Sequence, residues 1–335
     1  MIVLILLTPA RQRPLVASVA TIGTFDGVHV GHRSLFSRAI ELGQKLGVPT
    51  VAVTFHPHPA SVIRPEKTPL LLNSFEERLS LIDEVGIDYC YLVEFDAARA
   101  GEIAQDFVRG TLVSDLGVKA VVVGPDFRFG KNRIGDVNLL KSMGETMAFE
   151  VYADPFVVAQ GRCAAVARRL LPGTDENSDV VISSTLIRKM ILGGQFDVAR
   201  QCLDRDFFIS GLVVSGDGRG GSELGYPTAN VNFQEGRILP DDGVYAGWLR
   251  FGAESYPSAI SIGTRPTFYG DRGQRLIEAF VLDFNEDLYG RDVTVGFTEF
   301  IRPQLAFSSS TELVEQIASD VERVREISRR HLEIT

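Results

Sequence analysis

From residue 18 onward, short runs of β-branched residues alternate with stretches in which apolar residues recur at helical spacing. The runs predict strands at 18–22, 50–55, 88–93 and 119–123, and the other stretches predict helices at 32–46, 75–85 and 102–116. Gly47 and Gly86 stand where helix C-caps are expected, and Ser74 with Glu77 has capping-box spacing. This alternation predicts an α/β domain with a Rossmann-like parallel sheet and right-handed crossovers.

After residue 207 the pattern changes to short runs bounded by Gly, Pro, Asp and Asn. They predict strands at 208–214, 243–251, 258–262, 276–282 and 293–300. Such spacing favours an antiparallel sheet closed into a small β-barrel. One amphipathic helix ends the chain, opened by Ser309 and Glu312 in capping-box spacing. We expect its apolar stripe to pack on the barrel; the stripe is Leu313, Ile317, Val321 and Val324.

Between these two patterns, residues 159–179 show neither period, and we expect a surface loop there. A chain of 335 residues is long for one core. We therefore predict a first domain at 1–192, a linker at 193–206 and a second domain at 207–335.

The composition, 45% apolar and 23% charged, is that of a folded globular protein. The 34 basic and 43 acidic residues give a net charge of −9, which disfavours binding to nucleic acid or an anionic membrane. Residues 1–7 are apolar but too few to span a bilayer, and Arg11 and Arg13 follow them, so we expect a cytoplasmic protein. Three cysteines without Cys-x-x-Cys spacing support neither a disulfide framework nor a cysteine zinc site.

In the first half of the chain, the main group of candidate site residues follows the first predicted strand. It lies in the segment 23–32, Gly-Thr-Phe-Asp-Gly-Val-His-Val-Gly-His. Ligands of open α/β sheets bind at the carboxyl ends of strands, and a helix N-terminus offers free N–H groups to phosphate. Two imidazoles one helical turn apart can donate hydrogen bonds to a phosphoryl group as its negative charge grows. The expected site residues are the catalytic His29 and His32 and the phosphate-binding Gly23, Phe25, Asp26 and Gly31.

Two alternatives stay open for these histidines. One is a tight turn with two hydrogen-bonded histidines and no catalytic role. The other is a zinc site formed with His56 and His58, because imidazole is a common zinc ligand. The His-Pro-His-Pro sequence around that second pair is poorly suited to the supporting geometry, which disfavours zinc.

A second phosphate-binding candidate is the segment 182–188. Ser184 and Thr185 stand at a predicted helix start, where hydroxyl and N–H groups can hold phosphate. Arg188, three residues after Thr185, can neutralise a departing pyrophosphate. An ordinary helix cap has the same composition.

Candidate groups for a flat ligand follow the fourth strand, in the segment 124–131. There Asp126, Phe127 and Phe129 place aromatic rings beside a carboxylate, which suits a flat ring with a polar edge. Core packing of both phenylalanines is the alternative.

The second half contains a glycine-rich segment, 216–225, followed by Tyr-Pro-Thr-Ala-Asn. It satisfies Gly-x-Gly-x-x-Gly, but no helix is predicted after it, which excludes a dinucleotide-binding fingerprint. We expect its backbone N–H groups to wrap phosphates, with Gly220 and Gly225 among the binding residues. Thr228 and Asn230 offer two oxygen donors suited to a magnesium ion, although a simple hairpin ending in a Pro-Thr turn has the same residues.

Glu278 lies in an otherwise apolar predicted strand. A carboxylate there can accept a proton from a substrate hydroxyl, the role of the base in phosphoryl transfer. A solvated strand residue is the more common case for Glu.

Together these segments resemble one family. The segments 23–32, 124–130 and 182–188, in that order, resemble the adenylyltransferase module of bacterial bifunctional riboflavin kinase/FAD synthetases, within the HxGH nucleotidyltransferase superfamily. Glu278 and the segments 225–230, 263–268 and 283–290 resemble the riboflavin kinase module of the same family.

The resemblance implies two direct, in-line transfers. The second module would phosphorylate riboflavin to FMN with MgATP, using Glu278 as base and Thr228 and Asn230 at the metal and nucleotide. The first would let FMN attack a second ATP, giving FAD and pyrophosphate. The candidates for contact with the flavin ring are His58, Pro59, Asp126, Phe127 and Phe129.

Two other functions are alternatives to this one. The first is a single-activity enzyme with one inert module. The second is a non-catalytic flavin sensor, which is disfavoured because both modules carry full phosphate-binding sets and no basic DNA-reading helix is present in the sequence pattern.

Overall fold

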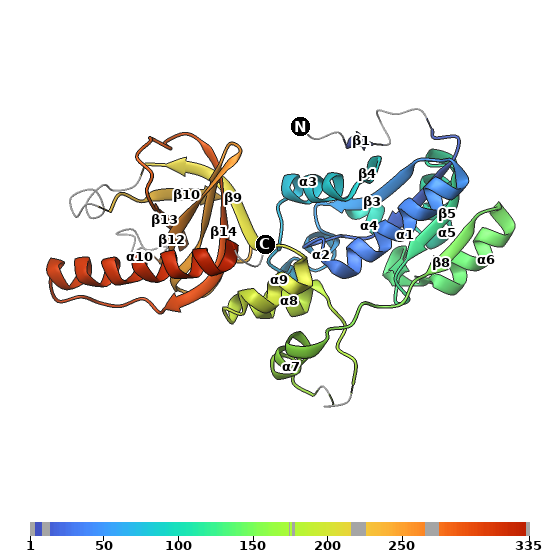
Figure 1. Cartoon of the computed structure of the whole chain (residues 1–335). Coiled ribbons are helices and arrows are strands. Elements are labelled where there is room, and N and C mark those ends of the chain that lie inside the picture. Colours follow the sequence, from blue (N-terminus) through green and yellow to red (C-terminus); the bar gives the residue numbers. More distant parts are fainter. Residues whose placement is uncertain are drawn as a thin grey trace. The chain divides into compact units, whose positions relative to one another are not determined.

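The protein is described by a computed structural model that covers residues 4–8, 14–173, 175, 178–215, 226–264 and 275–332. Contacts divide the chain into two units, Met1–Ala159 with Asp179–Ser184, and Gln160–Ser178 with Thr185–Thr335. Each unit is described by itself below (Figure 1).

Six parallel strands form the sheet of the first unit, in the order β1-β4-β3-β2-β5-β8. Their bounds are β1 (Ile5–Leu7), β2 (Ser18–Ile22), β3 (Thr50–His56), β4 (Tyr89–Glu94), β5 (Val118–Val123) and β8 (Glu150–Ala153). The predicted parallel α/β domain is confirmed, and its four predicted strands are β2 to β5.

Helices cover both faces of this sheet because the winding reverses at β2. The chain moves from β2 through α1 (Val30–Leu46) and α3 (Phe75–Val85) toward β4, then returns through α5 (Ala104–Phe107) and α6 (Val137–Met147) to β5 and β8 on the other side. Right-handed crossovers in opposite directions place the two sets of helices on opposite faces (Figure 1). The carboxyl ends of β2 and β5 are adjacent at this reversal, which is where ligands of such sheets are expected to bind.

Successive residues of β2 show the two cores. Val19 packs in a cluster with Leu42 of α1, whereas Ala20 belongs to the larger cluster that holds Leu112 and Leu140. The shorter elements of this unit are α2 (Pro59–Ile63), η1 (Pro65–Lys67), α4 (Ala97–Ala100), β6 (Arg128–Phe129), η3 (Lys131–Arg133) and β7 (Gly135–Asp136). The helix predicted at 102–116 is α5 continued by a π-helix, η2 (Val108–Asp115).

The loop predicted at 159–179 is wrong over its first half, where the chain forms α7 (Gly161–Leu170). Cys163, Ala164, Val166 and Ala167 make its buried face. These small residues carry a weak apolar signal between arginines, which explains why the helical period was missed. The Sγ atom of Cys163 lies 3.2 Å from that of Cys202 on the neighbouring α9.

The predicted linker contains α9 (Phe196–Leu203), which packs on the barrel. Phe196 stacks on Phe297 of β14 with ring centroids 5.7 Å apart. α8 (Ser184–Leu192) precedes it, and from Thr185 onward it also belongs to the second unit by its contacts. The boundary between units thus differs from the boundary expected at 192, and the functional extent of each domain stays a prediction.

Six antiparallel strands close the predicted barrel in the order β10-β13-β12-β11-β14-β9, which confirms the second fold prediction. Their bounds are β9 (Phe207–Val214), β10 (Ala229–Phe233), β11 (Gly243–Phe251), β12 (Glu254–Thr264), β13 (Arg275–Val281) and β14 (Asp292–Arg302). Val231, Ile260, Ile262 and Ile277 are nearly inaccessible to solvent and fill the interior. The strand β10 was not predicted.

The terminal helix α10 (Ser310–Leu332) lies against the outside of the barrel. The N–H of Glu312 donates to Ser309 Oγ over 3.1 Å, as the predicted cap requires, whereas the Glu312 carboxylate accepts from the N–H of Ser308 rather than from Ser309. The predicted apolar stripe is confirmed in Val321 and Val324, which pack on an outer cluster that includes Ala246 of β11.

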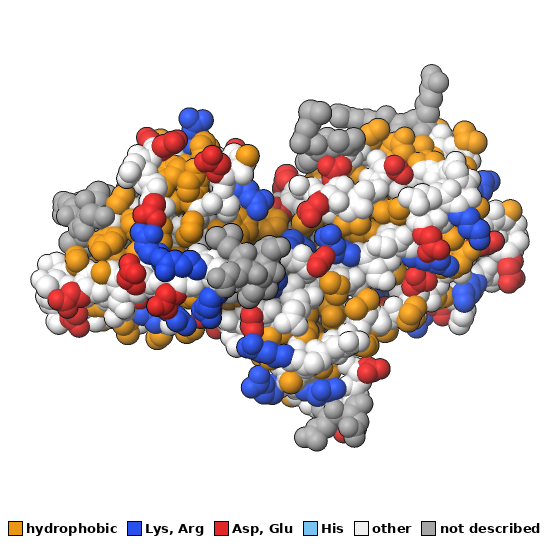
Figure 2. All heavy atoms as spheres, viewed as in Figure 1, with side chains coloured by type: hydrophobic (Ala, Val, Ile, Leu, Met, Phe, Trp, Pro, Cys, Tyr) orange, Lys and Arg blue, Asp and Glu red, His pale blue; other side chains and the backbone are white. Residues whose placement is uncertain are grey.

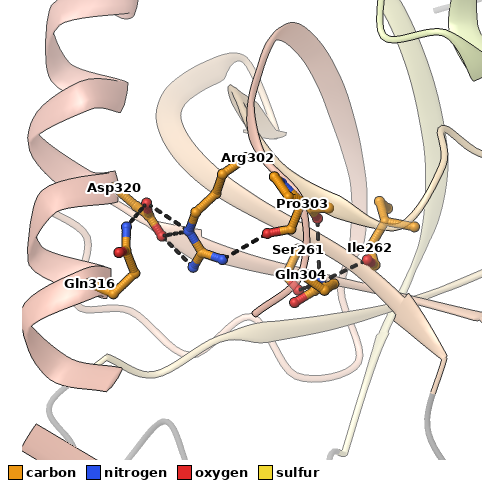
Figure 3. Close-up of polar contacts among 8 residues, drawn as sticks. Ser261, Ile262, Arg302, Pro303, Gln304, Gln316 and Asp320 are labelled. Carbon is orange, nitrogen blue, oxygen red and sulfur yellow. Dashed lines mark hydrogen bonds and ion pairs between the residues drawn. The ribbon is translucent and has the colours of Figure 1, made fainter. Parts of the chain in front are cut away.

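A buried ion pair fastens this helix to β14. The guanidinium of Arg302 donates through Nε and NH2 to Asp320, which is 4% exposed, over 2.6–3.0 Å. Gln316 donates to the same carboxylate from one turn earlier on the helix, over 2.9 Å. The pair is therefore well hydrogen-bonded, the condition under which a buried charge is tolerated (Figure 3).

Asp320→Ala is expected to lower the free energy of unfolding of the barrel unit by about 3 kcal/mol, because it leaves the half-enclosed Arg302 charge without its carboxylate. Trp248 of β11 is the single tryptophan of the chain, so its fluorescence during urea denaturation reports this unit. Glu315→Ala, which removes an exposed carboxylate from the same helix, is the control and should change stability by less than about 0.5 kcal/mol. Equal urea midpoints for Asp320→Ala and the wild type would contradict the assigned role.

Candidate active sites

The turn that follows β2 is held by a buried carboxylate. Asp26 is 3% exposed, and its Oδ1 accepts the N–H groups of Leu72 over 2.9 Å and Asn73 over 3.3 Å. Its carboxylate thus ties the turn to a segment almost fifty residues later, a contact that the sequence did not indicate. The predicted contact of Asp26 with phosphate stays a prediction.

The same turn has left-handed backbone at residues that are not glycine. Phe25 and Val28 have φ of 49° and 38°, and Gly27 between them has φ of 89°. The Phe25 ring is fully buried. Its centroid lies 5.3 Å from the centroid of the His32 ring, which it meets edge-on, and 4.7 Å from that of Phe36. Phe25 therefore supports the position of His32, and Gly23 leaves room for its ring, since a Cβ at Gly23 would lie 2.8 Å from it.

His29 and His32 stack at the N-terminus of α1, with ring centroids 3.6 Å apart and planes 20° from parallel. His29 is the N-cap, because its Nδ1 accepts the N–H of His32 over 3.4 Å. An accepting Nδ1 carries no proton, so the proton of a neutral His29 lies on Nε2, which is then a hydrogen-bond donor. A Cβ at Gly31 would lie 3.1 Å from the His29 ring, which explains the glycine between the two histidines.

The 182–184 segment meets this turn, as the two motifs require if they share a site. Ser184 Oγ donates to the carbonyl of Asp26 over 2.8 Å, and a Cβ at Gly31 would lie 3.7 Å from the carbonyl oxygen of Ile182. Asp26 and Ser184, 158 positions apart in the sequence, are thereby adjacent in the first unit. Thr185 and Arg188 follow on α8.

The segment after β5 divides between surface and core. Asp126 is exposed and Phe127 is half-buried, whereas Phe129 is 7% exposed within the large cluster of the sheet. The two phenyl rings stack with centroids 5.3 Å apart, and Phe129 also lies 5.9 Å from the ring of Phe107. Core packing, the open alternative, describes Phe129 fully and Phe127 in part, since Phe127 is half-buried against the same cluster, while Asp126 is exposed beside the carboxyl end of β5.

Arg78 is a site-forming residue that sequence reasoning missed. It is 6% exposed, and its guanidinium donates to the carbonyls of Thr24 over 2.6 Å and Phe55 over 3.1 Å, joining the ends of β2 and β3. Burial lowers the pKa of Arg78. An arginine on a predicted amphipathic helix gives no signal that separates this buried role from a solvated one.

His56 and His58 have structural partners. The His56 ring stacks on Phe75 with centroids 4.6 Å apart, and burial, with the nearby Arg78 charge, lowers the pKa of His56. His58 caps α2 through Nδ1, which accepts the N–H of Ala60 over 3.1 Å, and Pro59 is the first residue of that helix. Among the described residues, no group of three or more His, Cys, Asp or Glu side chains is arranged to hold a metal ion.

A second candidate site lies on the outer face of the barrel. Asn230 of β10 pairs with Glu278 of β13, and Glu278 pairs with Ser261 of β12, so the three side chains form one row across three strands. All three are half-buried, and Thr228 just before β10 is exposed. The register thus brings together two residues predicted from distant segments, Asn230 and Glu278.

Other predicted parts of this site have mixed outcomes. Gly220, Gly225 and residues 265–268 lie outside the described residues. Gly263 ends up beside Gln304, since a Cβ there would lie 3.4 Å from Gln304 Nε2. Asp283 pairs with Arg325 of α10 over 2.6–2.8 Å, and this hydrogen bonding lowers the pKa of Asp283.

Charged side chains of both signs are mixed over the visible face of the protein (Figure 2). Among the described helices, none is long and apolar enough to cross a membrane.

Comparison with known proteins agrees with this division of the chain. The family model of FAD synthetase matches residues 12–165, and that of riboflavin kinase matches residues 203–328. The first match contains the 23–32 turn and the second contains the row of Asn230, Ser261 and Glu278.

Relatives resemble the chain over nearly its whole length. A bifunctional riboflavin kinase/FMN adenylyltransferase of Escherichia coli K12 is 38% identical over 316 residues, which is 94% of either chain. The protein of the same name from Bacillus subtilis is 32% identical over 305 residues, 90% of either chain. A crystal structure of a macrolide-efflux protein from Streptococcus pneumoniae, 30% identical, matches with a TM-score of 0.82 over 96% of this chain and 99% of that one. The resemblance first seen in the motifs is confirmed, and the chain belongs to the bifunctional riboflavin kinase/FMN adenylyltransferase family.

Proposed function

We propose that this chain converts riboflavin to FMN on the barrel and FMN to FAD at the parallel sheet, using one ATP for each step. The carrying observation is that each unit has its own polar site, and that the stacked histidines of the first and the Asn230–Glu278 row of the second fall in separate family-model matches. Riboflavin, FMN and ATP are the substrates, and FAD with pyrophosphate and ADP are the final products.

In the kinase step, Glu278 is the proposed base. The riboflavin 5′-hydroxyl loses its proton to the carboxylate while its oxygen forms a bond to the γ-phosphorus of ATP. The bond from that phosphorus to the bridging oxygen breaks in line, and ADP leaves. The half-buried position of Glu278 supports this role, because it is accessible to a substrate and lies next to Asn230.

A magnesium ion fits the donors of this site. Thr228 and Asn230 offer a hydroxyl and an amide oxygen, which are hard ligands of the kind that Mg²⁺ prefers. Two such neutral donors suit an ion held mainly by nucleotide phosphates rather than by a protein cage. The ion would neutralise charge on the phosphates as ADP departs.

In the adenylylation step the nucleophile is a phosphate oxygen of FMN, so no protein nucleophile is needed. That oxygen forms a bond to the α-phosphorus of ATP, and the bond to the pyrophosphate oxygen breaks. His29 and His32 are proposed to donate hydrogen bonds to the reacting phosphoryl group, and Arg188 to neutralise the pyrophosphate. The stacked, capped geometry of the two histidines supports preorganised donation.

The other predicted contacts at the first site are also part of the proposal. Gly23, Phe25, Gly31, Ser184 and Thr185 are proposed to line the nucleotide phosphates of the first site. We also propose that the flavin ring contacts Asp126 and Phe127 after β5, and His58 and Pro59 after β3. A cytoplasmic location and the lack of nucleic-acid binding stay predictions.

Glu278→Gln should abolish FMN formation from riboflavin, because the amide cannot accept the proton, while FAD formation from supplied FMN continues at the wild-type rate. Both products are separable by chromatography of the reaction mixture. Glu235→Gln, an exposed carboxylate in the turn after β10, is the matched control and should leave both rates unchanged. Loss of both activities in Glu278→Gln would show that the two steps are not divided between the units as proposed.

His32→Ala should slow FAD formation from FMN by a factor of about 10²–10³, the effect of removing one preorganised transition-state donor. Riboflavin phosphorylation should persist, which makes the kinase step an internal control in the same sample. Ser37→Ala, at an exposed position of the same helix, tests for a general effect on α1. An adenylylation rate for His32→Ala within a factor of three of the wild-type rate would contradict the proposed role of His32.

A further inference from the structure

Ser261 is the third member of the outer row, and the proposed function gives it no role. The register of β12 and β13 sets it directly opposite Glu278. Opposed residues of antiparallel strands project from the same face with Cβ atoms about 4.5–5.5 Å apart, so a serine hydroxyl at 261 is within reach of a carboxylate at 278. The next row of this face, Ala246, Ala259 and Phe280, is covered by α10.

Gln304 determines which atoms of Ser261 remain to interact with Glu278. Its Nε2 donates to Ser261 Oγ over 3.0 Å and to the carbonyl of Ile262 over 2.9 Å (Figure 3). An amide NH₂ group is only a donor, so the serine oxygen is the acceptor in this contact. The hydroxyl proton of Ser261 is therefore available to another acceptor, and Glu278 is the residue opposite it in the sheet.

The backbone that carries Gln304 is itself held by hydrogen bonds. Arg302 NH1 donates to the carbonyl of Pro303 over 3.0 Å, and the same guanidinium is held by the buried Asp320 (Figure 3). Gln304 follows directly in the connection from β14 to α10. Side chains from the helix thus set the backbone that presents the amide to Ser261, and such support is what a precisely oriented group needs.

We propose that Ser261 is a positioning residue for the kinase step: its hydroxyl, fixed by Gln304, donates to one carboxylate oxygen of Glu278 and turns the other oxygen toward the riboflavin hydroxyl. The inference rests on the proposed function, because it needs Glu278 to be the base. A carboxylate has two oxygens, so one can accept from Ser261 while the other takes the substrate proton. The hydrogen bond also fixes the carboxylate rotamer before the substrate arrives, which lowers the entropic cost of the reactive geometry.

The test compares Ser261→Val with Ser261→Thr in the full-length chain. The two replacements have nearly the same shape and are both suited to a strand, but only threonine keeps the hydroxyl. We expect Ser261→Val to lower the kcat of riboflavin phosphorylation about tenfold with KM for riboflavin and ATP within about twofold, since one hydrogen bond to a charged group is lost. Ser261→Thr should keep kcat within about threefold of the wild type.

Gln304→Glu probes the second half of the inference, because it keeps the shape and removes the amide donor. It should lower kcat in the same direction, and its combination with Ser261→Val should be no slower than Ser261→Val alone, as expected for residues that act as one unit. FAD formation from supplied FMN and the urea midpoint of Trp248 fluorescence should be unchanged in every variant, which excludes a loss of folded protein.

Three results would overturn the inference: wild-type kcat in Ser261→Val, equal loss in Ser261→Val and Ser261→Thr, or a rise in KM without a change in kcat. The last would make Ser261 a substrate contact. Failure of the proposed function is recognised separately, because then Glu278→Gln would itself retain FMN formation. If Glu278→Gln formed no FMN while Ser261→Val formed it at the wild-type rate, Glu278 would remain the base and only the positioning role of Ser261 would be rejected.

Discussion

A buried carboxylate must be given hydrogen-bond donors, and the way Asp26 meets this requirement organises the first unit. Its side chain accepts two backbone N–H groups at 72 and 73, and its backbone carbonyl accepts the hydroxyl of Ser184. One residue in a tight turn thereby fastens two segments that are far away in the sequence. His29 and His32 follow within six residues, so the same contacts define the surroundings in which the imidazoles work.

The barrel meets a different constraint, that of strand register. Because side chains alternate between faces, shifting β13 by one residue would turn Glu278 into the interior and bring Ile277 outside. The buried Ile277 and Ala279 therefore specify the position of the carboxylate between them. The apolar residues of the same strand thus decide that the polar row faces outward.

Much of this arrangement could be predicted from the sequence where the signal is local. The strands and helices around β2 to β5 follow from apolar period and caps, and both candidate sites follow from short motifs. The pairing of Asn230 with Glu278 could not be derived from spacing alone, because β10 is short and half-polar and shows little alternation. The role of Arg78 was equally hidden, since burial of a guanidinium depends on carbonyls supplied by two other strands. The helix α7 was missed because alanine and cysteine mark a buried face only weakly.

Because the Glu278 row faces outward, the barrel interior does not have to satisfy both close packing and the placement of catalytic polar groups. Interior residues such as Ile260 and Ile277 are free to be selected for close packing, since no polar group of the row has to be accommodated among them. Interior substitutions that keep the strand register can then change thermal stability without changing which side chains face the substrate.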